Sequence, residues 1–115
     1  METVKKPWGH EKVFSFNEIS TVKTLNVNPN QLLSLQKHKK RKEMWYFLTD
    51  GYVELGNKKK KVKKGEVVII NKNTPHRLFA KKSPVSVLEI SFGKFEWDDI
   101  IRLEDSYNRE GTTKK

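Results

Sequence analysis

Four side chains in this sequence are suited to binding a metal ion, and their spacing brings them together. Gln36 and His38 stand two residues apart in a stretch of strand character, so their side chains point to the same face. A short turn through residues 39–42 returns the chain to Glu43, at the start of the next strand. His76 begins a later strand, after the turn sequence NKNTP. We therefore predict that these four residues converge inside a barrel.

The ligand atoms indicate which metals such a site would bind. The chain has no cysteine, so thiolate ligands, disulfides and cysteine nucleophiles are excluded. The remaining nitrogen and oxygen ligands suit a divalent cation such as Zn, Mn, Co or Ni. The lysines of residues 37–42 would alternate outward, away from the site. Lys40 is the exception, because it shares the parity of Gln36 and His38 and is expected to face inward.

The elements that must position these residues are strands. Turn signals such as Asp50-Gly51 and Gly56-Asn57 separate short segments rich in β-branched or aromatic residues. These segments are residues 9–16, 19–28, 31–38, 43–49, 51–57, 60–70, 76–80 and 85–93. Short strands at this spacing predict an all-β sandwich or barrel. Residues 95–110 have helical spacing instead, from which we predict a short C-terminal helix with Asp98 and Asp99 in its first turn.

Length and composition limit what the chain can be. Its 115 residues predict one domain, residues 1–115, and a hydrophobic content of 35% with 33% charged residues suits a small soluble protein. No apolar stretch approaches the roughly 18 residues that cross a bilayer. The N-terminus also lacks the apolar run of a signal peptide. We therefore expect a cytoplasmic protein with no membrane partner.

The chain is strongly basic, with a net charge of +10, and its field attracts anions. Nucleic acid, acidic membranes and phosphorylated small molecules are all candidates on charge alone. The densest basic cluster, KKKKVKK at residues 58–64, follows a hairpin turn and is interpreted as a solvated sheet edge. No aromatic residue interleaves with these lysines, as base stacking would require. Nucleic acid is therefore not the expected partner.

The predicted ligands fall within two longer motifs. Residues 30–43 occupy the frame of G-x5-H-x-H-x4-E, and residues 65–80 that of G-x5-P-x-G-x2-H-x3-N. The pair resembles the metal-binding motifs of the cupin superfamily. Gln36 in place of the first histidine resembles one branch, the type II mannose-6-phosphate isomerases. These usually form the C-terminal part of a bifunctional mannose-1-phosphate guanylyltransferase and mannose-6-phosphate isomerase.

The resemblance extends over roughly residues 6–109. KPWG, LSLQ, HRL and the tail DDIIRLEDSYNR are similar to segments of that branch. Arg41, Glu43 and Trp45 fall on its HRxEHW pattern. Two residues depart from the family pattern. Lys40 stands where the family often has a histidine, and Met44 stands where it has the histidine of EHW.

The resemblance implies a fold, an activity and a set of site residues. The fold is a cupin jelly-roll β-barrel, in a chain that pairs as a homodimer. The activity is isomerisation of mannose 6-phosphate to fructose 6-phosphate through an enediolate. Metal binding falls to Gln36, His38, Glu43 and His76, and substrate binding to Arg41 and Arg102. The general base stays open between Glu89, Lys40 and a water activated by the cation.

Three alternatives stay open beside the isomerase. A metal-binding cupin that binds a sugar or nucleotide-sugar without turnover is favoured by the replacement of the two family histidines. Another cupin enzyme, such as an epimerase or a dioxygenase, is compatible with a scaffold that hosts many chemistries. A nucleic-acid binder has only charge in its support.

Overall fold

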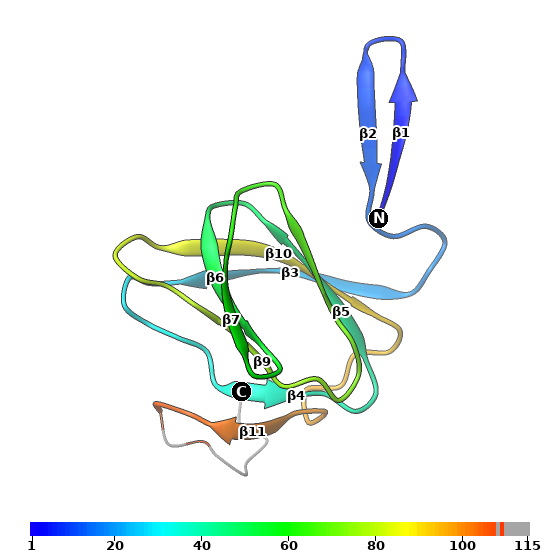
Figure 1. Cartoon of the computed structure of the whole chain (residues 1–115). Helices are drawn as coiled ribbons and strands as arrows, with labels where there is room; N and C mark the ends of the chain where they lie inside the picture. The colour runs from blue at the N-terminus through cyan, green and yellow to red at the C-terminus, as the bar shows by residue number, and fades with distance from the viewer. Residues whose placement is uncertain (108, 110–115) are drawn as a thin grey trace.

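A computed structural model describes residues 1–107 and 109, and the chain is built from antiparallel strands (Figure 1). The strands are β1 (Glu2–Lys6), β2 (Gly9–Val13), β3 (Ser20–Val27), β4 (Leu35–Lys37), β5 (Lys42–Phe47), β6 (Gly51–Leu55), β7 (Lys58–Val62), β8 (Val67–Ile70), β9 (His76–Phe79), β10 (Val85–Phe92) and β11 (Ile101–Glu104). The all-β prediction is confirmed. No described residue belongs to a helix that could cross a membrane.

Two sheets enclose the core. One has the strand order β3-β10-β5-β8 and the other β11-β4-β9-β6-β7. β1 and β2 form a separate hairpin that projects from one end of the barrel (Figure 1). Because connected strands often lie in different sheets, residues far apart in sequence become neighbours at the barrel interior.

Alternation along the strands decides which side chains enter the barrel. Trp45 and Phe47 of β5 face inward and are fully buried, as is Leu78 of β9. Burial of each such side chain stabilises the fold by roughly 1.5–3 kcal/mol. The same alternation directs Glu43 into the barrel with Trp45, although a carboxylate gains nothing from an apolar core.

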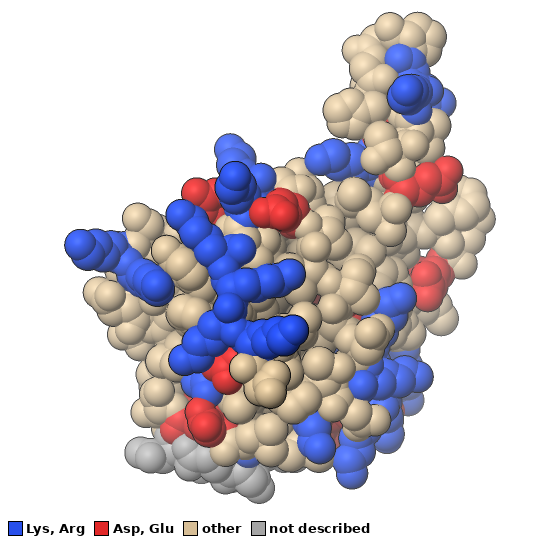
Figure 2. Space-filling view, in the orientation of Figure 1, with Lys and Arg blue, Asp and Glu red and all other residues tan. Residues whose placement is uncertain are grey.

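The lysine run forms an exposed sheet edge, as its sequence predicts. Residues 58–61 lie on β7, the terminal strand of its sheet, and their side chains are exposed. Lysine and arginine side chains gather over β6 and β7 (Figure 2). Aromatic residues do lie beside the lysines, from neighbouring strands: Tyr52 pairs with Lys61, and its ring stacks on Phe79 with centroids 5.4 Å apart.

The predicted C-terminal helix is wrong for the residues that the structure describes. Residues 101–104 form β11 instead, because Ile101 and Arg102 pair with the otherwise free edge of β4. Asp99 does not begin a helix. Its carboxylate accepts the backbone N–H groups of Lys39 and Lys40, at 2.9 and 3.0 Å, and so joins the tail to the loop after β4. Residues 108 and 110 of the predicted helix lie outside the described residues.

Gly51 tests how tightly the core is packed. A Cβ atom at this position would lie 2.6 Å from Val85 Cγ1 and 2.9 Å from Phe47 Cε2. We predict that Gly51→Ala lowers the free energy of unfolding by about 1–3 kcal/mol through overpacking, measured by urea denaturation. In the double variant with Phe47→Leu, the smaller side chain gives room, so the two losses should be less than additive. Full additivity would contradict this packing.

Candidate metal centre

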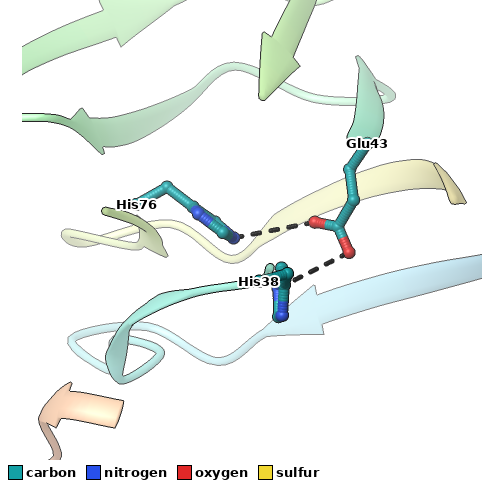
Figure 3. Close-up of side chains that lie close together, drawn as sticks. All are labelled: His38, Glu43 and His76. Carbon is teal, nitrogen blue, oxygen red and sulfur yellow. Dashed lines mark ion pairs between the residues drawn. The ribbon is translucent and has the colours of Figure 1, made fainter. Parts of the chain in front are cut away.

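Three of the predicted ligands meet at one end of the barrel interior. His38 directly follows β4, Glu43 lies on β5, and His76 begins β9. Their side chains are 3%, 1% and 0% exposed, and one ligand atom from each lies within 4.8 Å of the others. Figure 3 shows both imidazole rings beside the Glu43 carboxylate, each facing one of its two oxygen atoms. The three residues together are called the triad below.

Backbone carbonyls fix the tautomer of both rings. Nδ1 of His38 lies 2.6 Å from the carbonyl oxygen of Asp99, and Nδ1 of His76 lies 2.8 Å from that of Thr74. A carbonyl oxygen only accepts hydrogen bonds, so each Nδ1 carries the ring hydrogen. The lone pair of each Nε2 therefore faces the carboxylate. Metal-binding histidines are oriented by this kind of hydrogen bond.

Burial keeps both imidazoles neutral. It lowers the pKa of His76 from 6.5 to about 4, although the Glu43 carboxylate acts in the opposite direction. Burial also lowers the pKa of His38, again against the effect of Glu43. Since a histidine must be unprotonated to bind a metal, both rings are in the competent form near pH 7.

The triad fits a divalent cation. Nε2 of His76 and Oε1 of Glu43 are buried 3.6 Å apart without a hydrogen-bond partner, although both are acceptors. Nε2 of His38 lies at the same distance from Oε2. Metal–ligand bonds of roughly 2.0–2.2 Å place adjacent ligand atoms about 3–3.5 Å apart, close to these separations. A cation between the facing lone pairs would satisfy both orphaned atoms.

A cavity of about 260 Å³ adjoins the triad. Among the predicted site residues, Gln36, His38, Arg41, Glu89 and Arg102 line it. Gln36 pairs with His76 across β4 and β9, and its Oε1 accepts a hydrogen bond from Ser34 at 3.1 Å. The structure thus collects the predicted metal, catalytic and substrate-binding residues around one space, except Lys40.

Glu89 lies deep in this cavity. Burial raises the pKa of its carboxyl group, and the nearby charge of Glu43 raises it further. Trp45 Nε1 donates to Oε2 of Glu89 at 3.1 Å, and Lys23 Nζ lies 3.5 Å from Oε1. The carboxyl group is therefore held in one orientation, with a higher proton affinity than a free glutamate.

The inward orientation expected for Lys40 is wrong. Strand geometry ends at Lys37, so the period of two does not continue through the bend at residues 39–40. The Lys40 side chain is 68% exposed, with Nζ 3.1 Å from Glu96 Oε2, and this hydrogen bond raises its pKa. Lys40 therefore neither lines the cavity nor has the lowered pKa expected of a base.

Met44 also lies away from the cavity. It alternates with Glu43 and Trp45 on β5 and so faces outward, where it is buried but separate from the barrel core. The methionine in place of a family histidine consequently does not change the polarity of the cavity.

Sequence reasoning missed several residues of the cavity wall. Phe95 and Trp97, from the segment predicted as helical, line it, and Lys23 lies over both rings at 4.7 and 4.8 Å from their centroids. Alternation along β3 could have found Lys23, which shares a face with inward Leu25 and Val27. No local signal could have found the Asp99 carbonyl that orients His38.

The barrel has the cupin fold. Solved structures with the same fold include the capsular polysaccharide assembling protein CapF from Staphylococcus aureus. It has a TM-score of 0.67 and 16% identity, over 76% of this chain and 29% of that one. A cupin-2 domain protein from Rhodospirillum rubrum matches with a TM-score of 0.63 and 18% identity, over 73% of this chain and 58% of that one.

Sequence similarity gives the family. Residues 1–105 match the family described as "Mannose-6-phosphate isomerase C-terminal", and the chain belongs to it. Mannose-1-phosphate guanylyltransferase ManC of Salmonella typhimurium is 31% identical over 109 residues, and xanthan biosynthesis protein XanB of Xanthomonas campestris is 33% identical over 117. Both alignments cover 92% of this chain but 23% of the relative. The chain thus spans about a quarter of the length of these relatives.

The lowered pKa of His76 predicts a pH-dependent stability. Its folded pKa of about 4 lies below the unfolded 6.5, so the stability it contributes is present above pH 6.5 and is lost as the pH falls toward 4. The difference corresponds to about 3 kcal/mol. We predict this loss in urea denaturation of protein kept with a chelator, and a shallower dependence for His76→Gln. The same dependence in His76→Gln would contradict the assignment.

Proposed function

We propose that this chain is a metal-dependent sugar-phosphate isomerase that interconverts mannose 6-phosphate and fructose 6-phosphate. The observation that carries the proposal is the triad, with two facing acceptors that lack partners, beside a cavity lined by Glu89 and two buried arginines. Membership of the family and the mannose phosphate named for its relatives support the substrate class.

Four residues would hold the cation: His38, Glu43 and His76 of the triad, with Gln36 from the cavity wall. When bound, a cation of the Zn, Mn, Co or Ni type supplies a Lewis acid that stabilises negative charge developing on the sugar oxygens. Two neutral histidines and one anionic carboxylate would leave part of the cation's positive charge uncompensated, and this remaining charge would be available to the sugar oxygens. Arg41 and Arg102, both buried and both on the cavity wall, bind the substrate phosphate through bidentate hydrogen bonds.

Glu89 acts as the general base. It takes the proton from C2 of the aldose to form the enediolate and returns it to C1, while the hydroxyl proton on the C2 oxygen passes to the C1 oxygen, to give the ketose. A raised carboxyl pKa makes both transfers easier near neutral pH than they would be for an exposed glutamate. Hydrogen bonding to Trp45 keeps the carboxyl group fixed during the two steps.

A second candidate is a cupin that binds a metal and a sugar or nucleotide-sugar without turnover. The ion pair between Lys23 and Glu89 favours it, because a carboxylate held by a lysine is a weaker base. Turnover separates this candidate from the isomerase, since both require the metal.

Measurement of bound metal together with an isomerase assay tests the proposal. Purified protein should contain a divalent metal by elemental analysis and convert mannose 6-phosphate to fructose 6-phosphate in a coupled assay. Glu89→Gln should lower kcat by about 10²-fold or more with the metal retained, whereas His76→Gln should lose the metal. Bound metal without turnover on any hexose phosphate would favour the second candidate, and absence of metal would contradict both.

We also propose a homodimer in a cytoplasmic protein, as expected from the sequence. The outer face of the β3-β10-β5-β8 sheet supports a dimer, because Val22 on the edge strand β3 and Ile69 on the edge strand β8 are exposed apolar side chains. Met44 and Ile90, which lie between them, are already buried within the chain. Val22 is 56% exposed. Lys42 is the one charged side chain at the outward positions of these strands. Two copies of a chain of net charge +10 repel least at such a face.

The projecting β1–β2 hairpin fits the same interface. A two-stranded hairpin is marginally stable alone, and Trp8 at its turn is 72% exposed. A reciprocal exchange of this arm between two copies would bury both the tip and the sheet face.

Val22→Lys tests the dimer. It adds a second lysine to the apolar face of each copy, where Lys42 is otherwise the one charged side chain, so we predict that the wild-type mass in sedimentation equilibrium, twice 13.5 kDa, falls to that of one chain. Leu103→Lys is the matched control, because Leu103 is 44% exposed on the other sheet. A monomeric wild type, or a Val22→Lys variant that stays dimeric, would contradict this interface.

A further inference from the structure

Arg41 lies between the triad and the cavity and contacts both. Its Nε donates to Oε2 of Glu43 at 2.8 Å, and its Nη2 lies 3.3 Å from Nε2 of His38. On the cavity side, Nη1 donates to the carbonyl oxygen of Glu96 at 3.2 Å, and the guanidinium carbon is 4.4 Å from the centre of the Phe95 ring. The side chain is 7% exposed, so these contacts replace water around the guanidinium group.

The contact with His38 involves an atom that can serve only one partner. Nδ1 of His38 carries the ring hydrogen, because it donates to Asp99, and Nε2 has a single lone pair. This lone pair can accept a hydrogen bond from Arg41 or bind a metal ion, but it cannot do both. A divalent cation at the triad would in addition repel the guanidinium charge at short range.

We propose that Arg41 competes with the metal for His38 and that its release couples the metal centre to anion binding in the cavity. A cation on His38 frees Nη2, and the guanidinium group then presents two parallel N–H donors to a phosphate in the cavity. An anion that holds Arg41 in the cavity removes the competitor from His38. By linkage, each ligand raises the affinity for the other by the same factor. The inference rests on the proposed metal centre.

Calorimetric titration of metal-stripped protein with Co²⁺, with and without inorganic phosphate, tests the coupling. Phosphate at a concentration that keeps Co²⁺ soluble should lower the Kd of the wild type for Co²⁺ by about tenfold, within the usual range of coupling factors. Arg41→Met should bind Co²⁺ about tenfold more tightly than the wild type without phosphate, and phosphate should no longer change its Kd. The visible absorption of bound Co²⁺ gives a second readout of its coordination.

Lys40→Met is the matched control. It removes the same charge from the adjacent position, but the Lys40 side chain is exposed and pairs with Glu96 rather than with the triad. We expect this variant to keep the wild-type Kd and the wild-type effect of phosphate. An equal gain of affinity in Lys40→Met would show a general charge effect and overturn the proposal.

Two further outcomes separate this proposal from the metal centre itself. If the wild type binds Co²⁺ but Arg41→Met binds it equally or more weakly, or keeps the phosphate effect, the coupling through Arg41 is wrong and the metal centre stands. If neither the wild type nor Arg41→Met binds Co²⁺, the coupling and the metal centre are both wrong.

Arg41→Lys replaces Arg41→Met in this test if the methionine variant does not fold. The lysine ammonium group can pair with Glu43, but it lacks the second nitrogen with which the guanidinium group reaches His38. A wild-type Kd in Arg41→Lys would then overturn the proposal.

Discussion

The buried carboxylate of Glu43 is the constraint on which the site depends. A charge at 1% exposure is costly unless partners compensate for it. Arg41 provides a charged hydrogen bond to Oε2, and Ser91 donates to the same oxygen at 3.3 Å. Oε1 has no such partner and faces the lone pair of His76 instead. One oxygen of the carboxylate is therefore satisfied by the protein, and the other could bind a cation.

The two sheets bring the partners of Glu43 together by register. On the β3-β10-β5-β8 sheet, Glu43 pairs with Ser91 and Trp45 pairs with Glu89. The carboxylates of Glu43 and Glu89 therefore lie on adjacent strands, offset by two residues in the register. On the opposite sheet, Gln36 pairs with His76. A period of two then directs all these side chains into the barrel. These side chains thus meet in one region of the barrel because of strand pairing, whereas His38, which follows β4, is oriented by the Asp99 carbonyl from the segment between β10 and β11.

Much of this arrangement could be predicted from the sequence, because it follows from local periodicity. The strands, the turns and the approach of His38, Glu43 and His76 rest on alternation and on turn residues, which act over a few positions. The tail could not be predicted in the same way. Residues 101–104 have apolar spacing that fits a helix, but pairing with the free edge of β4 determines their structure. The inward orientation predicted for Lys40 is wrong because the alternation of side chains ends with β4, at Lys37.

The charge of the molecule gives the site an unusual electrostatic setting. A net charge of +10 attracts sugar phosphates but opposes the approach of a free divalent cation. Around the triad and the cavity, positive charges come from Lys23, Arg41, Arg102 and Arg109, while Glu43 and Glu89 supply the negative ones. Interactions among these buried groups are screened little by salt, whereas the exposed lysines act at long range and are screened within about 8 Å at physiological ionic strength. For the proposed isomerase, attraction of an anionic substrate would therefore depend on the exposed lysines, and retention of a cation on the buried triad.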